Sequence, residues 1–203
     1  MSKKPIIVFE GIEGTGKSHH INNVAKFLKK KNRKFLQIRE PGGSKNSEII
    51  RKLILNNRST FNRYTDLLLY LSARSENIEL IRKNIGKKII LIDRFSDSTI
   101  AYQHYGMGID LKFIININNF LLKNIDIDFT FLNTVNQKNM KKRLMKRKNL
   151  NRYDKFNYNF YNKVQQGFLK ILKKNTKKYL KIDSNLSIKH NERLILNKIN
   201  NLI

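Results

Sequence analysis

The sequence contains no cysteine, which excludes a disulfide framework and a thiolate zinc site. No apolar run approaches the ~20 residues that a transmembrane helix needs, and residues 1–5 carry no signal-peptide pattern. Proline- or serine-rich linkers and internal repeats are also missing. We therefore expect a single domain over residues 1–203, located in the cytoplasm and binding no membrane.

Acidic residues are scarce, at 15 Asp and Glu against 42 Lys and Arg, which gives a formal net charge of +27. One interpretation is a nucleic-acid-binding protein. The other is compositional drift, because Lys, Asn, Ile and Phe are all over-used, as an AT-rich coding sequence would produce. We favour drift, since the basic residues spread over the whole chain and Asn does not attract phosphate. The charge then predicts weak, non-specific polyanion binding and no specific nucleic-acid partner.

Five short apolar runs predict buried strands at residues 6–9, 35–38, 89–92, 129–132 and 179–182. Helical patterns lie between and after them, at residues 17–30, 45–56, 64–84, 97–105, 110–122, 136–147, 156–174 and 188–202. This alternation predicts an α/β fold, a five-stranded parallel sheet with helices on both faces. Ligands should bind at the carboxyl ends of the strands.

A complete GxxxxGK[ST] phosphate loop follows the first predicted strand and precedes a helical stretch. Its glycines let backbone N–H groups point at phosphate oxygens. Lys17 can reach the β- and γ-phosphates of ATP, and the Ser18 hydroxyl can bind Mg²⁺. The alternative is a glycine-rich turn that binds nothing. We expect ATP binding by Gly11, Ile12, Glu13, Gly14, Thr15, Gly16, Lys17 and Ser18.

Asp93 and Arg94 end the third predicted strand. A carboxylate at this position would lie near the Mg²⁺ bound through Ser18, although it could instead cap the following helix. The guanidinium of Arg94 matches phosphate geometry, and its alternative is a surface ion pair. Charged residues also follow the first, second and fifth predicted strands, so one polar crevice is expected.

Residues 93–103, DRFSDSTIAYQ, resemble the DR[YFH]xxSxxAYQ signature of thymidylate kinases of the bacterial type. Residues 9–14, 39–43 and 68–74 resemble further motifs of that family in the same order, and the resemblance runs from about residue 5 to the C-terminus. It implies a P-loop nucleoside-monophosphate kinase fold. The implied reaction is transfer of the γ-phosphoryl group of ATP to dTMP, giving dTDP for dTTP biosynthesis, with Mg²⁺ as cofactor. A homodimer packed through helices, including the one near residues 64–84, is also implied.

The resemblance assigns four residues to the thymine base. Tyr70 would stack on the ring, with ordinary core packing as its alternative, and Arg74 would donate to a thymine carbonyl. Ser98 and Gln103 would line the pyrimidine edge.

Four residues are similarly assigned to the sugar and phosphate of dTMP. Glu13 would accept from the 3′-OH, Tyr102 would exclude a ribose hydroxyl, and Arg39 and Arg94 would contact the monophosphate. That phosphate is already mostly dianionic at neutral pH, so no general base is needed.

A short basic lid is implied at about residues 138–153, in which Arg147 and Arg152 would swing over the phosphates and stabilise transition-state charge. The alternative is a solvated basic loop. The sequence departs from the family at Asn151, where Asp is usual, and at Met107, where Arg is common. His19 and His20 stand where Thr is usual, and we expect both at or near the surface.

Two other functions remain open at this stage. One is a P-loop kinase for a different monophosphate or deoxynucleoside, which a poor response to dTMP would favour. The other is a non-catalytic nucleic-acid-binding module, which would gain nothing from Lys17, Ser18, Asp93 and Arg94 together.

Overall fold

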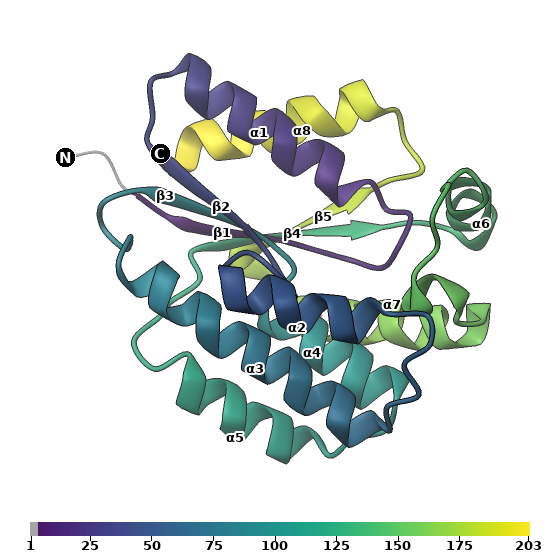
Figure 1. Ribbon diagram of the computed structural model, residues 1–203. Coiled ribbons are helices and arrows are strands. Elements are labelled where there is room, and N and C mark those ends of the chain that lie inside the picture. Colours follow the sequence, from purple (N-terminus) through teal and green to yellow (C-terminus); the bar gives the residue numbers. More distant parts are fainter. Residues whose placement is uncertain (1–3) are drawn as a thin grey trace.

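The computed structural model describes residues 4–203 and contains one parallel sheet (Figure 1). The strand order is β2-β3-β1-β4-β5, and every neighbouring pair is parallel. The strands are β1 (Ile6–Glu10), β2 (Phe35–Arg39), β3 (Ile89–Asp93), β4 (Phe129–Thr134) and β5 (Tyr179–Asp183). All five predicted strands and the predicted parallel sheet are confirmed.

The described chain contains eight α-helices, and both faces of the sheet are covered by helices. They are α1 (Lys17–Lys30), α2 (Lys45–Leu55), α3 (Arg63–Arg82), α4 (Ser96–Thr99), α5 (Leu111–Leu121), α6 (Gln137–Met145), α7 (Tyr158–Lys174) and α8 (Ile188–Leu202). In Figure 1, α1 and α8 lie on one face, and α2, α3, α5 and α7 lie on the other. Within residues 4–203, no helix is both long and apolar enough to cross a bilayer.

One predicted helix is subdivided in the structure, and another is preceded by a separate turn. The helix expected at 97–105 begins as α4 and continues as a π-helical segment, η1 (Ile100–Gly106). The helix expected at 156–174 is preceded by a separate 3₁₀ turn, η2 (Arg152–Lys155), because the Asn157 side chain accepts from Phe160 N at 2.9 Å and starts α7 anew. A third short turn, η3 (Thr176–Lys178), precedes β5.

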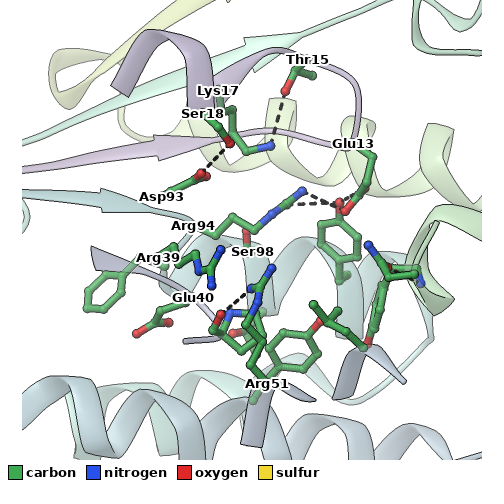
Figure 2. A pocket seen from close by; sticks show the side chains of 18 of the residues that line it. Glu13, Thr15, Lys17, Ser18, Arg39, Glu40, Arg51, Asp93, Arg94 and Ser98 are labelled. Carbon is green, nitrogen blue, oxygen red and sulfur yellow. Dashed lines mark hydrogen bonds and ion pairs between the residues drawn. The ribbon is translucent and has the colours of Figure 1, made fainter. Parts of the chain in front are cut away.

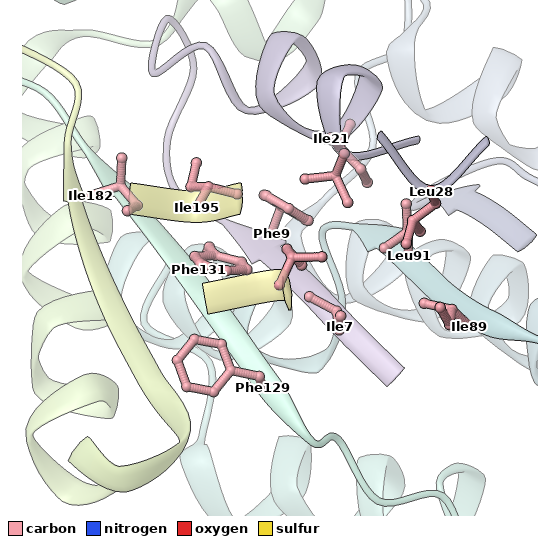
Figure 3. Packing of buried hydrophobic residues seen from close by; sticks show 12 residues of the cluster. Ile7, Phe9, Ile21, Leu28, Ile89, Leu91, Phe129, Phe131, Ile182 and Ile195 are labelled. Atoms are coloured by element: carbon pink, nitrogen blue, oxygen red, sulfur yellow. The ribbon is translucent and has the colours of Figure 1, made fainter. Parts of the chain in front are cut away.

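The core explains why β1 and β3, in the middle of the sheet, each begin with four apolar residues. Ile7 and Phe9 of β1 pack toward α1 and α8, and the Phe9 ring stacks on Phe131 of β4 with centroids 5.0 Å apart (Figure 3). Ile6 and Val8 pack on the opposite face of the sheet. Because both faces are buried, every residue of β1 must be excluded from water. This packing fixes the end of β1, and with it the position of residues 11–18.

Candidate functional site

The phosphate loop leaves β1 through glycines that hold conformations unsuited to other residues. Gly11, Gly14 and Gly16 have φ of 135°, 73° and 81°. A Cβ on Gly11 would lie 2.2 Å from the carbonyl oxygen of Asn133 in β4, so no larger residue fits there. The loop therefore depends on contact with the neighbouring strand as well as on local flexibility.

Lys17, the first residue of α1, folds back into this loop. Its Nζ donates to the carbonyl oxygens of Gly11 at 2.8 Å and Ile12 at 3.0 Å. Burial lowers its pKa to about 8. The ammonium group is thus enclosed by backbone carbonyls where phosphate oxygens could replace them.

Ser18 and Asp93 meet across the ends of α1 and β3, where the Ser18 hydroxyl donates to the Asp93 carboxylate at 3.0 Å (Figure 2). Among residues 4–203, no three His, Cys, Asp or Glu side chains gather as a metal site. One hydroxyl with one nearby carboxylate nevertheless fits Mg²⁺, which takes few protein ligands and completes its shell with phosphates and water.

A cavity of about 330 Å³ opens at the carboxyl ends of the strands (Figure 2). It brings together most of the side chains that the sequence predicts to act on nucleotides. The predicted residues that line it are Glu13, Gly14, Thr15, Gly16, Lys17, Ser18, Arg39, Tyr70, Arg74, Asp93, Arg94, Ser98, Tyr102, Gln103 and Arg147.

Arg94, Glu13 and Tyr102 form a closed triangle on the cavity wall. Arg94 donates to Glu13 at 2.9 Å and to the Tyr102 hydroxyl at 3.2 Å, and that hydroxyl donates to Glu13. Burial alone would lower the pKa of Arg94, but Tyr102, Glu13 and Asp93 raise it above its ordinary value. The carboxylate of Glu13 therefore has a cationic partner, and Arg94 stays charged.

Ser98 of α4 and Gln103 of η1 line the same cavity. The Ser98 hydroxyl donates to Glu10 at 2.5 Å, and burial raises the pKa of Glu10 to about 7. Gln103 is 1% exposed, and its side-chain nitrogen has no hydrogen-bond partner in the described part of the chain. An amide donor without a partner beside a cavity is suited to a base carbonyl.

Arg74 is buried behind the cavity, and three of its nitrogens bind protein acceptors. It donates to Glu40 at 2.8 Å, to Asn118 at 2.6 Å and to the Phe95 carbonyl at 2.9 Å. The arginine thus has a structural role that its sequence motif did not reveal, and its predicted contact with thymine stays a prediction. Tyr70, one turn earlier on α3, lines the same cavity.

Residues 9–195 match the sequence model of the thymidylate kinase family. The chain belongs to the thymidylate kinase family. The thymidylate kinase of Thermosipho africanus is 40% identical over 169 residues, covering 82% of this chain and 84% of that protein. That of Mycoplasma capricolum subsp. capricolum is 37% identical over 187 residues, covering 90% and 88%. The crystal structure of thymidylate kinase from Ehrlichia chaffeensis has a TM-score of 0.78 at 29% identity, covering 98% of this chain and 99% of that one.

Membership in the thymidylate kinase family confirms the predicted fold and enzyme class, and the family's substrates are ATP and dTMP.

The family's motifs did not, however, identify every residue of the site. Arg51 of α2 lines the cavity, donates to the Pro41 carbonyl at 2.5 Å, and has its pKa lowered by burial. Arg143 of α6 donates to the carbonyls of Gly14 at 2.8 Å and Ser184 at 2.6 Å. The sequence analysis missed both arginines, because each lies on a helix with several basic residues. Only the structure shows which of those residues points toward the site.

A second cavity, of about 260 Å³, adjoins the phosphate loop and corrects one expectation. It is lined by His19, His20, Arg143 and Leu186, among others. Both were expected at or near the surface. His19 is exposed, but His20 is only 4% exposed, so the expectation was wrong for His20. Burial lowers the pKa of His20 to about 4, which keeps its ring neutral.

The two lid arginines that the thymidylate kinase resemblance singles out lie in different places. Arg147 lines the cavity and pairs with the buried carboxylate of Asp154. Arg152 instead turns toward α3 and pairs with Asp66, and it is not among the residues that line the cavity. To reach the phosphates, Arg152 would have to break that pair, so its predicted catalytic role stays a prediction.

Proposed function

We propose that this chain phosphorylates dTMP to dTDP by holding ATP on the phosphate loop and dTMP in the adjoining cavity. The family supplies the reaction. The observation that carries the assignment of residues is one cavity that joins Lys17, the Ser18–Asp93 pair and the Arg94–Glu13–Tyr102 triangle. A protein that only binds nucleic acid has no use for this combination.

The phosphoryl transfer that we propose relies on charge neutralisation and positioning. Lys17 would exchange its two carbonyl partners for oxygens of the β- and γ-phosphates. Arg94 and Arg39, joined by Arg51, would hold the acceptor phosphate against the γ-phosphate. Ser18 would hold Mg²⁺ with Asp93 beside it, and the ion would neutralise charge on the β- and γ-phosphates. Arg147 would add positive charge from the lid.

The nucleoside half of the proposal follows from the deeper part of the cavity. Gln103 has a free donor for a pyrimidine carbonyl, and Tyr70 offers an aromatic face to the base. Tyr102 and Glu13 are already joined by a hydrogen bond, which places the Tyr102 ring beside the group that would accept from the 3′-OH. A ribose 2′-OH would meet that ring, so deoxyribose is expected to be selected.

We also propose a homodimer that packs through α3 and its neighbours. Tyr64 and Leu68 of α3 are 51% and 53% exposed, and Phe120 of α5 is 79% exposed. Apolar surface on adjacent helices is suited to burial against a second copy. Sedimentation velocity should give the dimer mass, whereas a monomer at micromolar concentration would contradict this part of the proposal.

We also propose that residues 1–203 form a single domain and that the protein is located in the cytoplasm.

A coupled assay of ADP release tests the function directly. ATP and Mg²⁺ would be supplied with dTMP, dUMP, dCMP, dGMP, UMP or AMP in separate reactions. A strong preference for dTMP is expected, and Lys17→Ala should show none of this activity. Turnover with another acceptor would reassign the substrate, and no turnover in a folded protein would favour the polyanion-binding alternative.

A further inference from the structure

Asp66 of α3 binds two consecutive residues at the end of the lid. One oxygen of its carboxylate accepts from the guanidinium of Arg152, and the other accepts from the Tyr153 hydroxyl at 3.2 Å. The Asp66 side chain is 4% exposed and that of Arg152 is 16% exposed. The Arg152 guanidinium also lies over the rings of Phe61 and Tyr153, at 5.8 and 5.2 Å from their centroids.

Other contacts fix the two ends of the lid. Near Arg152, the Asn57 side chain donates to the Leu150 carbonyl at 2.9 Å. At the other end, Arg143 bonds to carbonyls of the phosphate loop and of Ser184. The exposed residues 146–149 lie between these fixed points and include Arg147.

The anchored end of the lid is also part of the acceptor cavity. Tyr153 lines that cavity, and its ring meets Tyr70 edge-on with centroids 5.8 Å apart at 90°. The same ring meets Tyr102 at 6.1 Å. Asp66 therefore holds a lid residue against the two aromatic side chains that we assign to the base and the sugar of dTMP.

We propose that Asp66 is a positioning residue that ties the lid to the acceptor site, and that Arg152 is its anchor rather than a contact to the transition state. Occupation of the cavity by dTMP then steadies Tyr153, and Tyr153 steadies the exposed segment that carries Arg147. This inference rests on the proposed function. Withdrawal of Arg152 would leave the Asp66 carboxylate, 4% exposed, without its cationic partner. Arg147 also pairs with a buried carboxylate, but Asp154 keeps two hydrogen bonds from Asn151, and the Arg147 side chain is 41% exposed, so Arg147 moves at lower cost.

A double-mutant cycle separates the two roles of Arg152. Asp66→Asn and Arg152→Gln would be made singly and together, with Asp126→Asn and Arg193→Gln as exposed, charge-matched controls. If Arg152 is an anchor, each single variant loses about tenfold in kcat/KM for dTMP, and the double variant is no worse than the poorer single one. If Arg152 contacts the transition state, Arg152→Gln alone loses about 10³-fold and Asp66→Asn loses little, which would overturn the proposal.

Hydrogen exchange gives a readout that does not depend on turnover. In the wild-type protein, adding dTMP without ATP should slow the exchange of the amides of residues 146–153. In Asp66→Asn, adding dTMP should leave their exchange rates unchanged. Equal protection in both proteins would overturn the proposal. Tyr153→Phe, which deletes only one hydroxyl, provides the same test if Asp66→Asn does not fold. Loss of the proposed function would appear separately, as a wild-type protein that binds dTMP and releases no ADP.

Discussion

Arg74→Met should strongly destabilise the fold, because it leaves Glu40 buried without its cationic partner. Both side chains are almost completely enclosed, at 2% and 4% exposed, and their atoms approach to 2.8 Å. Breaking a buried pair of this kind costs about 3–5 kcal/mol of unfolding free energy. For a chain of this length each kcal/mol lowers Tm by about 2–4 °C, so a fall of roughly 6–20 °C is expected.

The loss of stability in Arg74→Met should depend on pH, because Glu40 titrates. Burial raises the pKa of Glu40 above 4.5, its value in an unfolded chain, and Arg74 opposes that rise. Without Arg74 the pKa of Glu40 should rise further. Above pH 4.5 the unfolded chain ionises Glu40 freely, whereas the folded protein must either bury the charge or keep the proton, so the free energy of unfolding falls. The loss of stability should therefore be larger at pH 8 than at pH 5.

Urea unfolding of the wild type, Arg74→Met and Arg74→Met/Glu40→Gln at both pH values measures these terms. The double variant should recover most of the lost stability, because it contains no buried charge at this position. Its KM for dTMP should stay raised if Arg74 also contacts thymine. A single variant within 1 kcal/mol of wild type, or an equal loss at pH 5 and pH 8, would refute the reasoning.

Three further predictions concern activity. The pKa of Lys17 is about 8, so kcat/KM for ATP should fall as the pH rises through that value, because the neutral amine attracts phosphate poorly. A flat profile to pH 9.5 would argue against phosphate binding by Lys17. Tyr102→Ala should relax discrimination between dTMP and its ribose analogue, measured as the ratio of their kcat/KM values; an unchanged ratio would remove Tyr102 from sugar selection. Arg147→Ala should lower kcat by about 10³-fold. Because it also removes the cation beside the buried Asp154, Tm is measured to show that the variant is folded at the assay temperature, and a kcat near wild type would support the solvated-loop alternative for the lid.

The sheet and the phosphate loop could be predicted because their constraints are local. A strand buried on both faces is mostly apolar, as β1 is from Ile6 to Phe9, and a loop with several positive φ angles favours glycine. The π-helical turn could not be predicted, since its Met107 N–H to Tyr102 carbonyl bond, at 2.9 Å, spans five residues without a sequence signature. The direction of Arg152 was equally hidden, because Asn151 caps a new turn there and rotates the arginine toward α3.

The hydrogen bonds around the main cavity bear on how much substitution this chain can tolerate. Of its fifteen acidic residues, seven accept a hydrogen bond from a side chain that lines the cavity. They are Glu10, Glu13, Glu40, Glu48, Asp66, Asp93 and Asp154. If acidic residues of this chain were replaced by lysine at random, nearly half of the replacements would remove a hydrogen-bond acceptor at the nucleotide site. We therefore expect further loss of acidic residues to be tolerated best at the eight positions outside this set.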